Sequence, residues 1–164
     1  MSVITDGYPS FAELKESPGF PSDGRMEKGP VAVIECVQNI PCDPCAWCCP
    51  REAIQVGEDI TALPRLIEDR CNGCGTCIAA CPGQAIFLAD INYSESEALV
   101  TFPYEFVPLP REGDRVTAAN REGAPVTAGV VVKVRTGKTL DRTAVISLAV
   151  PKEFAADVRG IFIE

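Results

Sequence analysis

The sequence contains no histidine among its 164 residues. This absence excludes histidine-ligated haem, Rieske centres, zinc sites that mix cysteine with histidine, and catalytic triads that use a histidine base. The chain also lacks an uninterrupted apolar run near the roughly 20 residues that a membrane-spanning helix needs. We therefore expect no direct insertion into a membrane.

Positive charge is also scarce, because 15 Lys and Arg residues stand against 23 Asp and Glu residues, a net charge of −8. Proteins that bind nucleic acids present a basic face to the phosphates. We therefore expect no nucleic-acid partner. The acidity fits two interpretations equally well: steering toward a basic surface on a redox partner, or ordinary solubility.

Sequence features of secretion and catalysis are missing as well. A secretory leader needs a basic segment followed by an apolar one, and residues 1–10 have neither. We therefore expect a cytoplasmic protein whose nine cysteines are thiols rather than disulfides. No glycine-rich phosphate loop is present, and the acidic residues are scattered among turns. We expect no catalytic site of the chain's own.

The cysteines that are present follow a pattern, which is clearest in the second of two runs. This run reads Cys71-Asn-Gly-Cys74-Gly-Thr-Cys77-Ile-Ala-Ala-Cys81-Pro82. Such spacing is typical of bacterial-type [4Fe–4S] sites, in which the fourth cysteine binds the other cluster of a two-cluster protein. Zinc ribbons, the main alternative, use isolated Cys-x2-Cys pairs instead. The run therefore predicts an iron–sulfur cluster.

A looser copy of this run extends from Cys36 to Pro50. When the Cys-Pro steps are aligned, the matched pairs are Cys42 with Cys74, Cys45 with Cys77 and Cys49 with Cys81. The position that matches Cys71 is Asn39, and Cys36 lies three residues before it. The simplest account is a three-residue insertion that displaces the first ligand to Cys36. The residues after each Cys-Pro step also repeat, which indicates two similar half-domains.

Two residues of the first run have open roles. Cys48 could replace Cys36 as a ligand, form a vicinal pair with Cys49, or be a bystander. The third interpretation is favoured, because free cysteine packs well as a small hydrophobe. Trp47 either shields a cluster from water or fills the core, and we favour the core.

Residues from about 31 to 91 resemble a dicluster bacterial-type ferredoxin domain. The resemblance implies a compact α+β domain with two [4Fe–4S] clusters, each held by three cysteines of one run and one of the other. Carried over by position, the ligands of cluster 1 are Cys36, Cys42, Cys45 and Cys81, and those of cluster 2 are Cys71, Cys74, Cys77 and Cys49. The first loop contains prolines, which lack an N–H donor for the cluster sulfurs. We therefore expect the two clusters to differ in reduction potential.

The flanking segments follow other patterns. Residues 1–30 are rich in Gly and Pro and predict an extended arm, with one short helix over 10–16 that Ser10 caps together with Glu13. Residues 93–164 carry β-branched runs separated by turns, as in a small antiparallel barrel. We thus expect an α+β chain in which the arm precedes a ferredoxin-like dicluster domain, residues 31–92, and a small antiparallel β-barrel-like domain, residues 93–164.

This organisation predicts an iron–sulfur electron-transfer subunit of an oxidoreductase complex. Two [4Fe–4S] clusters would relay electrons to or from a flavin-containing dehydrogenase subunit or another redox partner protein. The flanking segments exceed what a free ferredoxin requires and are interpreted as docking surfaces. Two alternatives are a free, diffusible ferredoxin and an iron–sulfur protein for redox sensing or interaction, whose clusters would resist reversible reduction.

Overall fold

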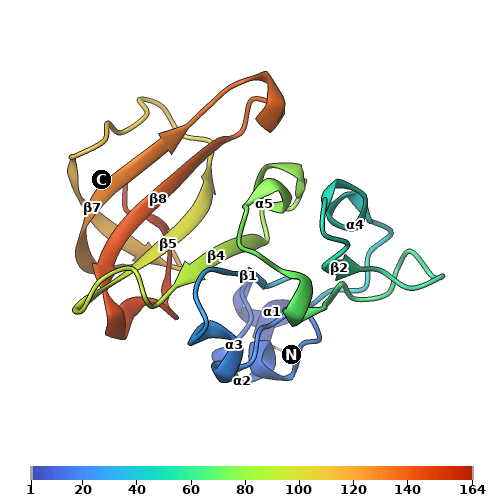
Figure 1. The fold of residues 1–164 in the computed structure, drawn as a ribbon. Coiled ribbons are helices and arrows are strands. Elements are labelled where there is room, and N and C mark those ends of the chain that lie inside the picture. Colours follow the sequence, from blue (N-terminus) through green and yellow to red (C-terminus); the bar gives the residue numbers. More distant parts are fainter. Residues whose placement is uncertain (1, 164) are drawn as a thin grey trace.

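A computed structural model describes residues 2–163, and its main feature is a seven-stranded antiparallel sheet. Its strands are hydrogen-bonded in the order β1-β4-β5-β8-β7-β6-β9 (Figure 1). In chain order they are β1 (Val31–Ile34), β4 (Ile86–Asp90), β5 (Glu97–Tyr104), β6 (Arg115–Asn120), β7 (Pro125–Arg135), β8 (Ala144–Pro151) and β9 (Val158–Ile161). The long C-terminal strands coincide with the β-branched runs of the sequence, because such side chains pack well on a pleated surface.

The remaining elements are short. A two-stranded sheet joins β2 (Ile54–Gln55) to β3 (Arg65–Leu66) in the link between the cysteine runs. The α-helices are α1 (Ser2–Asp6), α2 (Phe11–Glu16), α3 (Asp23–Met26), α4 (Pro44–Cys48) and α5 (Thr76–Ala80). The 3₁₀ helices are η1 (Glu68–Arg70), η2 (Lys138–Leu140) and η3 (Lys152–Phe154). None of the helices in residues 2–163 has the length and hydropathy that a membrane span requires.

The N-terminal segment contains α1, α2 and α3, which lie together near β1 (Figure 1). The predicted capping box at α2 is confirmed: the Ser10 side chain accepts from the backbone N–H of Glu13, whose carboxylate accepts from the Ser10 N–H at 2.9 Å. Leu14 of this helix is fully buried. The segment therefore packs on the rest of the chain through a helix.

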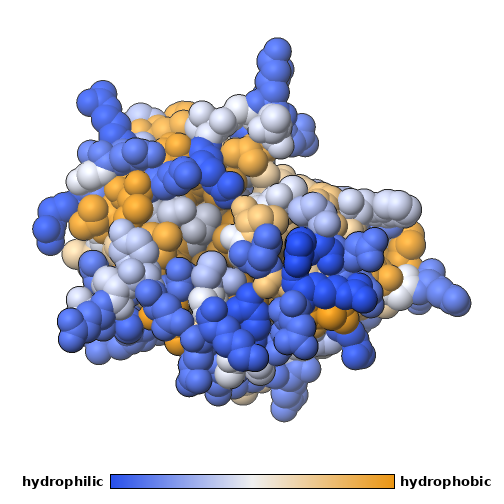
Figure 2. Space-filling view, viewed as in Figure 1, coloured by the Kyte–Doolittle hydropathy of each residue, from blue (hydrophilic) through white to orange (hydrophobic). Residues whose placement is uncertain are grey.

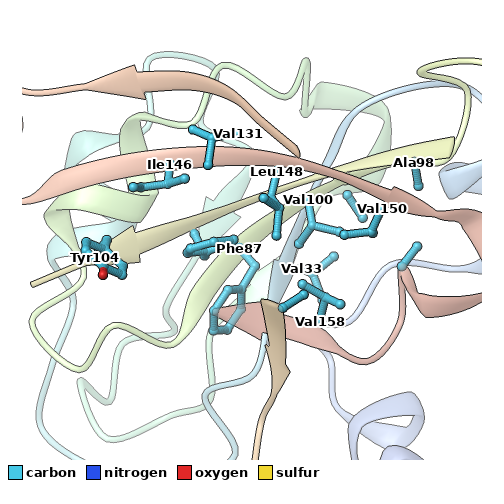
Figure 3. Close-up of a cluster of buried hydrophobic side chains, with 14 of the residues drawn as sticks. Val33, Phe87, Ala98, Val100, Tyr104, Val131, Ile146, Leu148, Val150 and Val158 are labelled. Carbon is cyan, nitrogen blue, oxygen red and sulfur yellow. The ribbon is translucent and has the colours of Figure 1, made fainter. Parts of the chain in front are cut away.

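The main core lies beneath the large sheet and draws on both halves of the chain. Figure 3 shows Phe87 of β4 beside Val33 of β1 and Val158 of β9. The buried apolar residues of this cluster are Val33, Phe87, Ala89, Ala98, Val100, Phe102, Tyr104, Ala118, Val131, Ala144, Ile146, Leu148, Val150, Ala155 and Val158. Outside the core, Figure 2 shows a largely hydrophilic surface with some hydrophobic residues over β7 and β8.

The sheet continues across the predicted domain boundary at residues 92 and 93. On either side of it, β4 and β5 are neighbours in register, with Leu88 opposite Thr101 and Asp90 opposite Leu99. A strand edge with unpaired backbone groups needs a partner, and β5 supplies it for β4. The division into three domains stays a prediction, but one sheet joins the segments before and after residue 92.

Candidate metal centre

The two short helices α4 and α5 carry one buried cysteine each, Cys45 and Cys77, and the helices contact each other. Pro44 occupies the first turn of α4, where a proline fits because its missing N–H would have no partner in the helix. At α5 the cap residue is Gly75, in a left-handed conformation with φ of 79°. These starts place the cysteine trios on loops that turn sharply into a helix.

One hollow brings together Cys36, Cys42, Cys45 and Cys81. We call it hollow 1. Its other lining residues are uncharged: Ile34, Gln38, Ile40, Ala62, Pro64, Pro82 and Ile86. These four cysteines are the ones that the resemblance assigns to cluster 1.

A second hollow brings together Cys49, Cys71, Cys74 and Cys77. We call it hollow 2. Its other lining residues are Ala32, Pro50, Arg51, Ala53, Ile54, Asn72, Gly73, Gly75, Thr76 and Leu88. All four cysteines assigned to cluster 2 therefore lie around one cavity, although their binding to iron stays a prediction.

The residues around both hollows suit iron–sulfur clusters. Each hollow offers four sulfur atoms, the soft ligands that such clusters use. Backbone N–H groups donate to three of these sulfurs: Ala53 to Cys49 at 3.2 Å, Ala32 to Cys71 at 3.4 Å, and Ala85 to Cys81 at 3.4 Å. Hydrogen bonds of this type help set the potential of a cluster. Within residues 2–163, no three or more His, Cys, Asp or Glu side chains are arranged to hold a single metal ion, whereas a [4Fe–4S] cluster distributes its cysteines over several irons.

Burial dominates the electrostatics of the thiols. It raises the pKa of Cys45 to about 12 and also raises the pKa of Cys36, Cys42 and Cys77, with further contributions from neighbouring thiols. Since the thiolate is the form that binds metal, binding of iron must release protons. Cys74 differs from these thiols. Burial acts to raise its pKa, but hydrogen bonds with Thr76 and the charge of Arg135 outweigh this effect and lower the pKa.

The ninth cysteine, Cys48, lines neither hollow. It is half-buried, forms no disulfide, and donates through its thiol to the backbone oxygen of Cys45 at 3.4 Å. Cys36 is the residue that lies with the other three cysteines of hollow 1. This arrangement favours the bystander role for Cys48.

The preferred interpretation of Trp47 is wrong, because its side chain is 83% exposed rather than in the core. Its indole N–H donates to the Asp43 carboxylate at 2.8 Å, four residues earlier. Cys45 is the buried residue of the five-residue α4, and positions two apart, such as 45 and 47, lie on different sides of a helix. Trp47 lies on the open side, where Asp43 satisfies its polar group.

Arg25, which no sequence pattern indicated, stabilises the second cysteine run by direct hydrogen bonds, although it lies far from that run along the chain. Its guanidinium donates to the backbone oxygens of Gly29, Pro30, Glu68 and Cys71, the last at 2.6 Å. The side chain is buried at the end of α3. Arginine has five donors in a fixed geometry, so a single residue can fix several loop carbonyls at the entrance to this run.

A buried charge network holds the start of the first run. The Glu35 carboxylate, directly before Cys36, accepts from Arg159 at 2.6 Å and from Arg121 at 3.0 Å. Arg159 also lies over the ring of Phe87, 5.1 Å from its centroid. Because buried charges need partners, this network links the end of β1 to β9 and to the turn after β6. No sequence pattern near Glu35 indicated these partners.

Comparisons with known proteins agree with the cysteine pattern. The family described as "4Fe-4S binding domain" matches residues 64–87, which contain the whole second run. The ferredoxin-type protein NapF of Haemophilus influenzae (strain Rd) is 36% identical over 61 residues, which cover 36% of this chain and 35% of NapF. The match thus spans about a third of the length of that relative. No solved structure matches the chain significantly.

These matches bear on the part of the chain that contains the hollows. The family match covers residues that line hollow 2 and Cys81 of hollow 1. Such domains hold [4Fe–4S] clusters, which carry electrons. The two matches therefore support a ferredoxin-type 4Fe–4S binding domain in this chain, with at least one [4Fe–4S] cluster.

Proposed function

We propose that the chain is an electron-transfer subunit that relays electrons through two [4Fe–4S] clusters within an oxidoreductase complex. Its partner would be a flavin-containing dehydrogenase subunit or another redox protein. The observation that carries the proposal is the presence of two separate hollows, each lined by four cysteines. Three cysteines of each hollow come from one run and the fourth from the other, which is the arrangement of a two-cluster protein.

The chain's own residues would make this pair of sites a relay. Each cluster, when bound, supplies reversible uptake of one electron. The helix α4, which carries Cys45 of hollow 1, contacts α5, which carries Cys77 of hollow 2, so the two sites are built on adjacent helices. Buried apolar side chains such as Ile34 and Ile86 line hollow 1 and limit the access of water. Solvent exposure and hydrogen bonds to sulfur are among the factors that set cluster potentials.

A protein partner is supported by the loop after β5. Phe106, Val107 and Leu109 expose 58%, 89% and 39% of their surface there. Neighbouring exposed apolar side chains of this kind are typical of protein interaction sites. The loop therefore offers a docking surface of the type that a subunit of a complex needs.

The test is anaerobic purification of the tagged chain from its own host at native expression, followed by analysis of iron, flavin and accompanying polypeptides. We expect about eight irons per chain, the content of two cubanes, and a flavoprotein or other redox protein in stoichiometric amount. A chain that arrives alone with the same iron content would instead be a diffusible ferredoxin. About four irons would contradict the two-cluster proposal, and clusters that resist reversible reduction would indicate redox sensing or a structural role.

A further inference from the structure

Fixed charges differ between the two hollows. No charged side chain lines hollow 1. Two carboxylates are adjacent along the chain to its cysteines: Glu35, directly before Cys36, is ion-paired with Arg121 and Arg159, whereas Asp43, directly after Cys42, forms no ion pair in the described part of the chain. Hollow 2 is lined by Arg51, and a second arginine, Arg135, lies close to Gly75, which is another of its lining residues. The surroundings are thus negative at Cys42 and positive around hollow 2.

Arg135 is placed by the sheet. It is the last residue of β7, pairs with Val145 of β8, and is half-buried. A methyl group built on Gly75 would lie 2.8 Å from a terminal nitrogen of Arg135. Because Gly75 directly follows Cys74 and caps α5, the guanidinium lies against the backbone that positions two predicted ligands of cluster 2.

The charge of Arg135 is not neutralised locally. In the part of the chain that the structure describes, no carboxylate forms an ion pair with it. Arg135, Lys133 and Cys74 line a common cavity, in which Asp90 is the one acidic residue. Two positive charges and one negative charge therefore face the exposed Cys74.

We propose that Arg135 raises the reduction potential of cluster 2 above that of cluster 1, so that cluster 2 is the first of the two to accept an electron. Reduction adds one electron to a cluster, and no bond forms or breaks. A nearby positive charge stabilises the added negative charge, and a partly buried one is weakly screened. Asp43 has the opposite effect at cluster 1. This inference rests on the proposed two-cluster function and states which of the two clusters is reduced first.

The test compares midpoint potentials of the purified cluster-loaded chain in redox titrations followed by EPR. Wild type is expected to show two midpoints. Arg135→Gln should lower the higher midpoint and leave the lower one unchanged, whereas Arg135→Lys should largely preserve both. Asp43→Asn should raise the lower midpoint, because a negative charge beside cluster 1 is lost. The amide oxygen of the introduced Asn can still accept from the indole N–H of Trp47.

Lys152→Gln is the matched control for the loss of one positive charge. Lys152 is exposed and begins η3. Val145, the partner of Arg135, lies at the start of β8, whereas Lys152 follows the end of that strand. Seven residues of strand separate the two, a distance of about 20 Å. It should leave both midpoints unchanged. Lys133→Gln, the second variant at the cavity, should lower the higher midpoint by less than Arg135→Gln and provides the test if Arg135→Gln does not retain its clusters.

The outcomes separate this inference from the proposed function. Two reversible midpoints that Arg135→Gln and Lys133→Gln both leave unchanged would overturn the role of Arg135 while the two-cluster relay stands. A shift of the lower midpoint instead would reverse the proposed order of the clusters. A wild-type chain without two reversible midpoints would overturn the proposed function and this inference together.

Discussion

Gly73 shows how tightly single residues are constrained in the second cysteine loop. Its φ of 69° lies in the left-handed region, and a methyl group there would lie 2.6 Å from the Pro30 Cβ and 2.7 Å from the Pro30 backbone oxygen. Gly113, in the turn before β6, also has a positive φ, 92°, but a methyl group would meet nothing within 4 Å. A substitution at Gly113 therefore measures the cost of backbone strain alone, whereas one at Gly73 measures the cost of backbone strain together with steric overlap.

We expect Gly73→Ala to destabilise the protein more than Gly113→Ala. Both changes cost about 1–2 kcal/mol of left-handed backbone strain, but only Gly73→Ala also forces the loop away from Pro30. Because that loop carries Cys71 and Cys74, the variant should also lose iron. Thermal unfolding and iron analysis of both variants check this, and equal losses in the two would contradict it.

At the scale of single elements, α2 is stabilised by its capping residues. The Glu13 carboxylate accepts from the Ser10 hydroxyl at 2.8 Å and from the Ser2 backbone N–H at 2.9 Å, as well as from the Ser2 hydroxyl. Hydrogen bonds from Ser2 and Ser10 lower the pKa of Glu13 from 4.5 to about 2. A lowered carboxyl pKa means that the folded state favours the ionised form.

The contribution of Glu13 should depend on pH in a defined direction. Above pH 4.5 the carboxyl is ionised in both the folded and unfolded chain, so the full stabilisation is present; it is lost as the pH falls toward about 2. We expect Glu13→Gln to lower the melting temperature by a constant amount from pH 8 to pH 5, and by less at pH 4. A difference that grows below pH 5 would contradict this assignment.

For the whole molecule, the large sheet makes the ferredoxin segment dependent on the C-terminal strands. β4 has β5 as a ladder partner, and Val33 and Phe87 pack in a core completed by strands after residue 96. The Glu35 network adds a buried charge connection, through Arg121 and Arg159. Loss of the C-terminal strands would leave Glu35 without either partner, and a buried charge without a partner is costly.

We therefore expect a fragment ending at residue 92 to fail to hold its clusters, although it contains all nine cysteines. Removal of β5 exposes the edge of β4 and the apolar side chains of Val33 and Phe87, which favours aggregation. Iron content and circular dichroism of the fragment, measured beside the full chain under anaerobic conditions, check this. A soluble fragment with the iron content of the full chain would instead support an independent domain over residues 31–92.

The sequence by itself determined features that depend on nearby residues. The capping box of α2, the C-terminal strands and the spacing of the cysteine trios are of this kind, because helix caps, strand patterns and loop spacing act over a few residues. The resemblance to a dicluster ferredoxin added the grouping of Cys49 with the second run and of Cys81 with the first, and each of these cysteines lines the hollow of the run it was grouped with.

Only the tertiary structure decided the contacts between distant segments. The pairing of β4 with β5, the support of Cys71 by Arg25 and the position of Arg135 against Gly75 join residues that no local pattern connects. The exposure of Trp47 belongs here too, since it follows from which side of α4 is buried. Such contacts depend on how whole elements pack, and packing is a property of the complete core rather than of any short stretch of sequence.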